Sequence, residues 1–140
     1  MNTPFSRLFV IGVVSALLIF SSCKEVLTNT ELLTQHTWEF SSVEHSDPDP
    51  DLKEFYTILL TGITTKFNSD GTYFIDAPDS SLADDSSGPW EFGADETTII
   101  IDKGTADEST STILDLTEST FSYSITDSLG TATVKWLPKE

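Results

Sequence analysis

Apolar and polar residues alternate along most of the second half of the chain. The alternation is clearest between residues 121 and 126, where Phe121, Tyr123 and Ile125 are separated by hydroxyl residues. A period of two is typical of a strand with one apolar face and one solvated face. Shorter runs bounded by Gly, Asp, Ser or Thr give the same signal, and together they predict strands at residues 37–43, 64–68, 72–77, 90–92, 97–103, 111–116, 121–126 and 131–137.

One connection between predicted strands has a specific turn signal. Ser69, Asp70 and Gly71 separate the strand at 64–68 from the strand at 72–77. A glycine in a short Asp-Gly connection supplies the positive φ that a tight hairpin needs. These two strands are therefore predicted to pair as an antiparallel hairpin. A polar loop at residues 78–87 is predicted to follow.

Two short helices are predicted before the run of strands becomes continuous. Residues 31–35, with Thr30 or Asn29 as the N-cap, would lay Leu32 and Leu33 on the body of the domain. The second helix follows the proline-containing loop at 47–51, with Asp51 as its N-cap and Gly62 at its end. Its apolar positions repeat at i, i+3, i+4, i+7 and i+8, and they are Leu52, Phe55, Tyr56, Leu59 and Leu60.

The order of these elements predicts an all-β fold. Eight strands with short connections after residue 64 favour antiparallel pairing between sequential neighbours. Such a meander closes most simply into an eight-stranded up-and-down barrel, because closure removes the exposed edges. The short N-terminal helix would precede the barrel, and the second helix would be inserted between strands one and two. A two-sheet β-sandwich is the alternative.

The N-terminal residues differ in pattern from the rest of the chain. Residues 8–20 are thirteen uncharged, mostly apolar residues that follow Arg7. A bilayer-spanning helix needs about 20 residues, so this segment is too short to cross a membrane. It is typical of a secretory signal peptide that is removed from the mature protein.

The chain has a single cysteine, Cys23, directly after this segment. A lone cysteine in an exported chain has no partner for an intramolecular disulfide, so it is either a free thiol or a modified residue. Ser21 and Ser22 before Cys23 resemble the lipobox of bacterial lipoproteins. The resemblance implies cleavage before Cys23, a diacylglycerol on its sulfur and usually a further acyl chain, such as palmitate, on its amine.

This resemblance also implies a location and a domain division. Bacterial lipoproteins with Lys rather than Asp after the cysteine, as at Lys24 here, generally go to the outer membrane. The protein would be lipid-anchored there, on the periplasmic face or at the cell surface. The division is a signal peptide at 1–22, a lipidated cysteine and tether at 23–30, and a barrel domain at 31–140.

Composition narrows the choice of partners. The chain has 7 Lys+Arg against 23 Asp+Glu and a formal net charge of -16. Nucleic-acid binding depends on cationic side chains that neutralise phosphates, so DNA and RNA are excluded as partners. Anionic head groups would also repel this surface, so membrane attachment is expected through lipid rather than through the protein surface.

Three local motifs, in this order, resemble the small lipocalin-like lipoproteins of Gram-negative bacteria. They are Leu32-Leu33 leading into Trp38-Glu39-Phe40, the segment from Phe67 to Tyr73, and the segment from Gly88 to Phe92, followed by strands up to Trp136. The resemblance covers residues 31–137. It implies a barrel that binds or carries a small apolar or amphipathic molecule, and it offers no defined catalytic residues.

The aromatic residues of the predicted strands are the candidate ligand-binding set. An eight-stranded barrel is just wide enough to be filled by its own side chains or to hold one small ligand. The sequence leaves a filled barrel and a hollow barrel open. The candidate lining residues are Trp38, Phe40, Phe67, Tyr73, Trp90, Phe121, Tyr123 and Trp136.

A filled barrel would have a different function. It would be a structural or interaction lipoprotein that contacts another envelope protein through its acidic loops. A carbohydrate platform, with sugars stacked on Trp90 or Trp136, is a further alternative.

The sequence contains no catalytic or metal-binding signature. The only histidines, His36 and His45, belong to no zinc-type motif, and no nucleophile elbow is present. The loop with Asp47, Asp49 and Asp51 resembles the start of a calcium loop but lacks the later glycine and glutamate of an EF-hand. We therefore expect no enzymatic activity, no cofactor and no metal.

One further motif concerns modification. Asp127, Ser128 and Leu129 resemble the short signal for O-glycosylation in some bacteria, and they fall where a loop between the last two strands is predicted. Ser128 is the candidate acceptor, and a plain turn is the alternative.

Overall fold

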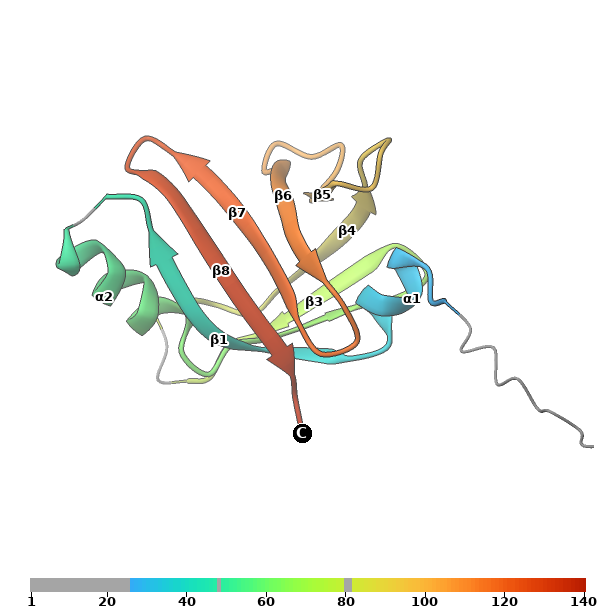
Figure 1. The fold of residues 1–140 in the computed structure, drawn as a ribbon, viewed down its shortest axis with the longest axis horizontal. Coiled ribbons are helices and arrows are strands. Elements are labelled where there is room, and N and C mark those ends of the chain that lie inside the picture. The colour runs from blue at the N-terminus through green and yellow to red at the C-terminus, as the bar shows by residue number, and fades with distance from the viewer. Residues whose placement is uncertain (1–25, 48, 80–81) are drawn as a thin grey trace, which may run out of the picture.

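The computed structural model describes residues 26–47, 49–79 and 82–140. The predicted signal peptide and Cys23 lie outside the described residues. Eight strands form a closed antiparallel barrel in which each strand pairs with the next and the last pairs with the first (Figure 1). This topology confirms the predicted up-and-down barrel, and the sandwich alternative is wrong.

All eight predicted strands are present. Their bounds are β1 (Thr37–His45), β2 (Thr64–Phe67), β3 (Thr72–Asp76), β4 (Ser86–Phe92), β5 (Thr98–Ile101), β6 (Ser109–Leu116), β7 (Phe121–Asp127) and β8 (Gly130–Pro138). The largest difference is at β4, which begins inside the predicted loop. There Ser86 pairs with Ile75 of β3, so neighbouring backbone extends a strand that its own polar residues did not predict.

The first helix, α1 (Asn29–Thr34), begins earlier than predicted. Its N-cap is Thr28, so the predicted caps at Thr30 and Asn29 are wrong. Thr28 Oγ1 accepts the backbone N–H of Glu31 at 3.2 Å, and the Glu31 carboxylate accepts the backbone N–H of Thr28 at 2.8 Å. This reciprocal capping box fixes the start of the helix and lowers the pKa of Glu31 through these hydrogen bonds.

The second helix, α2 (Pro50–Leu60), lies between β1 and β2 as predicted. Its N-cap is Asp49 rather than the predicted Asp51. Pro50 occupies the first helical position, where a missing N–H costs nothing because that group has no partner within the helix. The helix ends at Leu60 with Thr61 as its C-cap, and the predicted terminating glycine, Gly62, follows with a φ of 80° that suits glycine.

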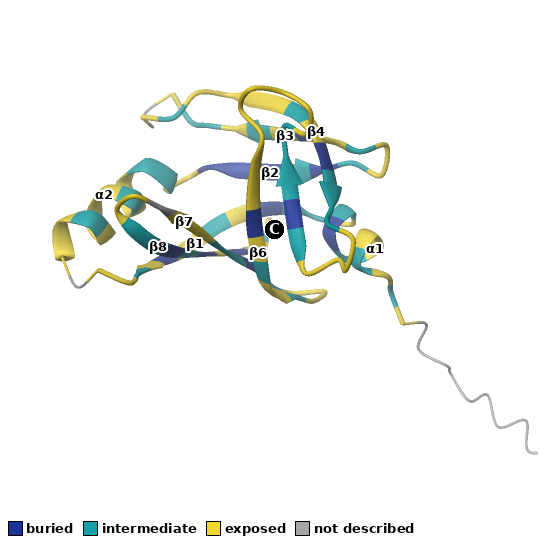
Figure 2. Cartoon of the chain, turned by 90° about the horizontal axis from the view of Figure 1, so that it is seen from above, coloured by how far each residue is buried: buried dark blue, intermediate teal, exposed yellow. Residues whose placement is uncertain are grey.

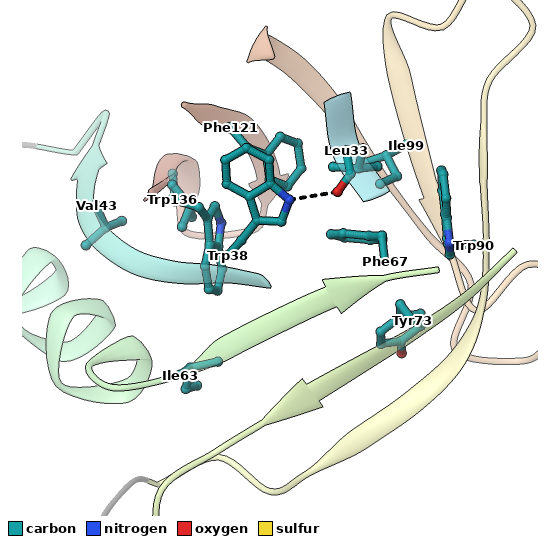
Figure 3. Packing of buried hydrophobic residues seen from close by; sticks show 12 residues of the cluster. Leu33, Trp38, Val43, Ile63, Phe67, Tyr73, Trp90, Ile99, Phe121 and Trp136 are labelled. Carbon is teal, nitrogen blue, oxygen red and sulfur yellow. Dashed lines mark hydrogen bonds between the residues drawn. The ribbon is translucent and has the colours of Figure 1, made fainter. Parts of the chain in front are cut away.

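The two helices lie at opposite ends of the barrel. The indole N–H of Trp38 donates to the carbonyl of Leu33 in α1 at 2.8 Å (Figure 3). Lys66 Nζ donates to the carbonyls of Thr34 at 2.6 Å and His36 at 3.1 Å. We call the end that α1 covers the closed end and the opposite end, beside α2, the mouth.

A cluster of aromatic rings fills the barrel toward the closed end. Phe67 is at its centre, with ring centroids 5.4 Å from Trp90 and 5.9 Å from Phe121 (Figure 3). Trp38 packs on Phe121 from β1 at 5.7 Å, and both side chains are completely buried. Figure 2 shows that buried residues lie mainly on the strands, whereas α2 has none.

Candidate functional site

A cavity of about 200 Å³ lies inside the barrel, between the ring cluster and the mouth. Its aromatic lining consists of Phe67, Tyr73, Phe121, Tyr123 and Trp136. Its aliphatic lining consists of Ile75, Ile99, Ile101 and Ile125, and its hydroxyl lining of Thr65, Ser109 and Ser111. The lining is mostly apolar, and it contains no charged side chain among the described residues.

Five of the eight predicted ligand-binding residues line this cavity. The structure places the other three elsewhere. Trp38 and Trp90 are buried in the packing of the closed end. Phe40 is half-buried and packs edge to face against Trp136, with ring centroids 6.0 Å apart.

The isoleucine and hydroxyl residues of the lining were not predicted. They occupy inward positions of β2, β3, β5, β6 and β7, at the same alternating spacing as the aromatic residues. On β6, for example, Ser111 is buried between the exposed Thr110 and Thr112. The alternating pattern identifies these positions as inward-facing. They were missed because the predicted ligand-binding set contained only aromatic residues.

The cavity volume lies between the two expectations for the barrel. Cavities of about 150 Å³ bind single apolar rings, whereas pockets for drug-sized ligands usually exceed about 300 Å³. The 200 Å³ cavity therefore fits one small molecule. The barrel is filled by its own rings toward the closed end and hollow toward the mouth.

A second hollow of about 200 Å³ lies between α2 and the barrel. The helix contributes Tyr56, Leu59 and Leu60, and strands β7 and β8 contribute Tyr123, Ile125, Ala132 and Val134. Tyr123 and Ile125 line both this hollow and the barrel cavity. The apolar face of α2 therefore covers the mouth without filling the space beneath it.

Tyr123 has an unusual polar environment. Its hydroxyl faces a mostly apolar cavity, and its ring lies between Phe121 and Trp136. Burial raises the pKa of Tyr123 to about 12, and the nearby indole N–H of Trp136 offsets a smaller part of that rise. The phenol is therefore neutral at ordinary pH and able to donate a hydrogen bond.

The three tryptophans differ in whether the indole N–H has a hydrogen-bond partner. Trp38 donates to Leu33 at 2.8 Å, and Trp90 donates to the carbonyl of Asn68 at 3.1 Å. The indole N–H of Trp136 is buried and has no hydrogen-bond partner among the described residues.

The second cavity-lining tyrosine is already paired. The Tyr73 hydroxyl donates to the Asp102 carboxylate, 3.0 Å from either oxygen. Burial and then Asp102 raise the pKa of Tyr73. A Cβ at Gly88 would lie 2.0 Å from an Asp102 oxygen, so glycine leaves room for this pair.

The remaining candidate residues lie outside the cavity. Ser128 is exposed in the two-residue turn between Asp127 and Gly130, where a loop was predicted, and its glycosylation stays a prediction. The carboxylates of Asp47 and Asp49 accept backbone N–H groups two residues on, at 2.9 and 3.0 Å. Within the described ranges, no group of three or more ligating side chains could hold a metal ion.

The burial of Trp90 and Trp136 contradicts the alternative that these residues stack on sugars. Trp90 and Trp136 are only 6% and 3% exposed, so neither presents a ring face to solvent. Their rings are used in the ring cluster and in the cavity wall. Sugar stacking on these two side chains is therefore wrong for this fold.

Comparison with known proteins adds no family assignment. No protein-family model matches the chain, and a search of curated proteins found no match. Over the described residues, no helix has the length and apolar character needed to cross a membrane. The class is thus defined by the structure itself: an eight-stranded up-and-down β-barrel with an aromatic cluster and a small internal cavity.

Proposed function

We propose that this protein is a non-catalytic binding protein whose barrel holds one small, mostly apolar molecule. The observation that carries the proposal is the 200 Å³ cavity at the mouth side of the ring cluster. Its lining combines aromatic and aliphatic side chains with a few hydroxyl groups. This is the usual composition of a small-molecule site, in which apolar surface supplies affinity and a few polar groups orient the ligand.

We further propose that the protein is anchored at the outer membrane through lipid on Cys23. The apolar segment at 8–20 and the lone cysteine after two serines support this proposal. Only six residue steps separate Cys23 from Asn29, the first residue of α1, and they span at most about 21 Å. With this short tether, the closed end of the barrel would lie nearest the membrane.

A filled barrel that contacts another envelope protein is the second candidate. The small size of the cavity favours it, since 200 Å³ is below the volume of most ligand pockets. Its acidic loops would supply the contact surface. The two candidates differ in whether the purified protein retains a small molecule.

Native mass spectrometry separates the two candidates. The protein, produced with its own N-terminal segment in a Gram-negative host, is purified in a bulky steroid detergent and exposed to an extract of envelope lipids and metabolites. We expect a one-to-one adduct on the wild-type protein. Ser111→Phe should abolish the adduct because Ser111 is a buried lining residue, whereas Thr112→Phe on the outer face of β6 should retain it.

Two outcomes would contradict ligand binding in the cavity. One is a bare mass for the wild-type protein under these conditions, which supports the filled-barrel candidate. The other is an adduct that persists in Ser111→Phe, which places the ligand elsewhere. Thermal unfolding of both variants establishes that they are folded, and Tyr123→Trp provides a second way to occupy the cavity.

The anchor has its own test. Cells grown with a fatty-acid analogue should incorporate the label into the wild-type protein and not into Cys23→Ser. Equal labelling of the two proteins would show that the lipoprotein proposal is wrong.

A further inference from the structure

The barrel cavity and the hollow beneath α2 meet at Tyr123. This side chain lines both spaces, together with Ile125. In the hollow beneath α2, the other lining residues are leucine, alanine and valine side chains and Tyr56. The Tyr123 hydroxyl is thus a polar group placed in a mostly apolar enclosure, and the side chain that acts on it by hydrogen bonding is Trp136.

A second buried donor lies beside it. Trp136 is 3% exposed, and its indole N–H has no partner among the described residues. The two rings are stacked with centroids 6.5 Å apart and an interplanar angle of 21°. Buried polar groups in folded proteins are nearly always paired. The Tyr123 oxygen can accept the Trp136 indole proton, so the group left to be paired is the Tyr123 hydroxyl proton, which needs a further acceptor.

The charge of the surroundings restricts which acceptor fits. No Lys, Arg or His lines either hollow. Asp102, which contacts the lining residue Tyr73, is bound to its hydroxyl, and the whole chain carries a formal charge of -16. A carboxylate ligand would be buried without a cationic partner, which is strongly unfavourable.

From these observations we infer that Tyr123 selects neutral small molecules that carry one hydrogen-bond acceptor, such as aldehydes, ketones or esters, over carboxylates and over purely apolar compounds. This inference rests on the proposed binding function. The Tyr123 hydroxyl donates to the acceptor of the ligand. Trp136 is a positioning residue, whose indole N–H donates to the Tyr123 oxygen once the hydroxyl proton points into the cavity.

The three tryptophans provide a direct measurement. Each gives one indole signal in a ¹⁵N–¹H spectrum, and those of Trp38 and Trp90 belong to donors already paired with backbone carbonyls. The protein in a bulky steroid detergent is titrated with toluene, benzaldehyde and benzoate, which share one ring and differ in the acceptor. Benzaldehyde should bind about fivefold more tightly than toluene, as expected for one hydrogen bond, and benzoate should bind most weakly.

The spectrum should also report the mechanism. Benzaldehyde should move the Trp136 indole proton signal downfield, since the hydrogen bond from that N–H to the Tyr123 oxygen strengthens when the Tyr123 hydroxyl donates to the ligand, while the Trp38 and Trp90 signals move little. Tyr123→Phe should remove both the preference for benzaldehyde and the shift of the Trp136 signal. Thr112→Val is the control, because Thr112 is exposed on the outer face of β6 and lines neither hollow, and it should leave both unchanged.

Three results would overturn the inference. Equal affinity for toluene and benzaldehyde, with a stationary Trp136 signal, would leave the cavity as an apolar binding site and the proposed function intact. Tightest binding of benzoate would contradict selection for neutral molecules. If none of the three compounds binds, the proposed function fails together with the inference.

Discussion

Lys66 is one of 7 basic residues in a strongly acidic chain, and its charge is used inside the fold. Its ammonium group donates to the carbonyls of Thr34 and His36, at and just after the end of α1. Helix C-termini expose carbonyls without partners within the helix, and a cation there is favourable. At this position a lysine therefore attaches the helix to the barrel.

We predict that Lys66→Met lowers the free energy of unfolding by about 2 kcal/mol, because charge-assisted hydrogen bonds to two carbonyls are lost. Urea denaturation measures the change. Lys135→Met is the matched control, since the Lys135 side chain is exposed and makes no side-chain hydrogen bond to another described residue. It should change stability by less than about 0.5 kcal/mol. Equal losses in the two variants would mean that only the net charge matters.

Tyr123 makes stability depend on alkaline pH. Its pKa rises from 10.0 to about 12 on folding, so the folded state retains the phenol proton where the unfolded state has lost it. This contribution is fully present below pH 10 and is lost as the pH rises through 12.

We therefore predict a difference between wild type and Tyr123→Phe in urea denaturation at pH 10 and pH 11. The wild type should lose about 1 kcal/mol more than the variant over this interval. The subtraction removes the titration of lysines and of the other tyrosines. An identical pH dependence in the two proteins would show that Tyr123 is not held in a low-dielectric environment.

The cavity residues show what alternation can and cannot predict. A period of two places Phe121 and Tyr123 on the inner face of one strand, and the structure confirms this for both. It gives no information on depth along the barrel axis, which depends on the register between strands. Trp38 and Trp90 share the inner face but lie below the cavity for this reason.

At the scale of elements, α2 has one face toward the barrel and one toward solvent. Tyr56, Leu59 and Leu60 line the hollow beneath the helix, whereas Phe55 and Ile58 are 50% and 54% exposed. The helical period predicted the existence and length of this element. It grouped Phe55 with the buried face because two apolar neighbours one residue apart cannot be separated by period alone.

We predict that Leu60→Ala destabilises the protein by about 1.5 kcal/mol, less than a fully buried leucine would cost because the side chain is only half-buried. Ile58→Ala on the solvent face should cost less than about 0.5 kcal/mol. Chemical denaturation of both variants measures the difference. Equal costs would mean that α2 does not pack on the mouth through the face described above.

The N-cap residues of the two helices were predicted less well than the helices themselves. The signal for α1 was present as Thr28 followed three residues later by Glu31. The predicted caps, Thr30 or Asn29, lie nearer to Leu32 than Thr28 does. At α2, Pro50 was predicted to lie in the loop at 47–51, but it occupies the first helical position, where its ring is tolerated.

At the scale of the whole molecule, the sequence predicted closure of the barrel because sequential strands with short links leave few other arrangements. It did not predict the irregularity in β1, where the pairing with β8 shifts between Phe40 and Ser42. Such bulges depend on the fit between two strands far apart in sequence. The sequence likewise did not decide whether the barrel contains a cavity. The volume of the cavity is the volume inside the barrel minus the volume of the many side chains packed there.

The overall charge should make stability depend on ionic strength. A formal charge of -16 destabilises the compact state through self-repulsion, which salt screens. We predict that raising NaCl from about 0.01 M to about 0.1 M, where the Debye length falls from about 30 Å to about 10 Å, raises the melting temperature by about 4 °C. The same change near pH 4.1, the isoelectric point, should have little effect. An equal rise at both pH values would exclude charge repulsion as the cause.

The pairing of β1 with β8 brings the two ends of the barrel sequence together. Trp38 lies opposite Pro138, and the backbone N–H of Lys139 donates to the carbonyl of Thr37 at 2.8 Å. The strands thus form a ring in which no strand is structurally the first, so circular permutation is compatible with the fold. A permutant with its new ends in the turn at Ser128 and Leu129 would carry any N-terminal lipid at the mouth instead of the closed end. It would invert the barrel relative to the membrane. Every strand pairing would remain, and only the turn between β7 and β8 would be opened.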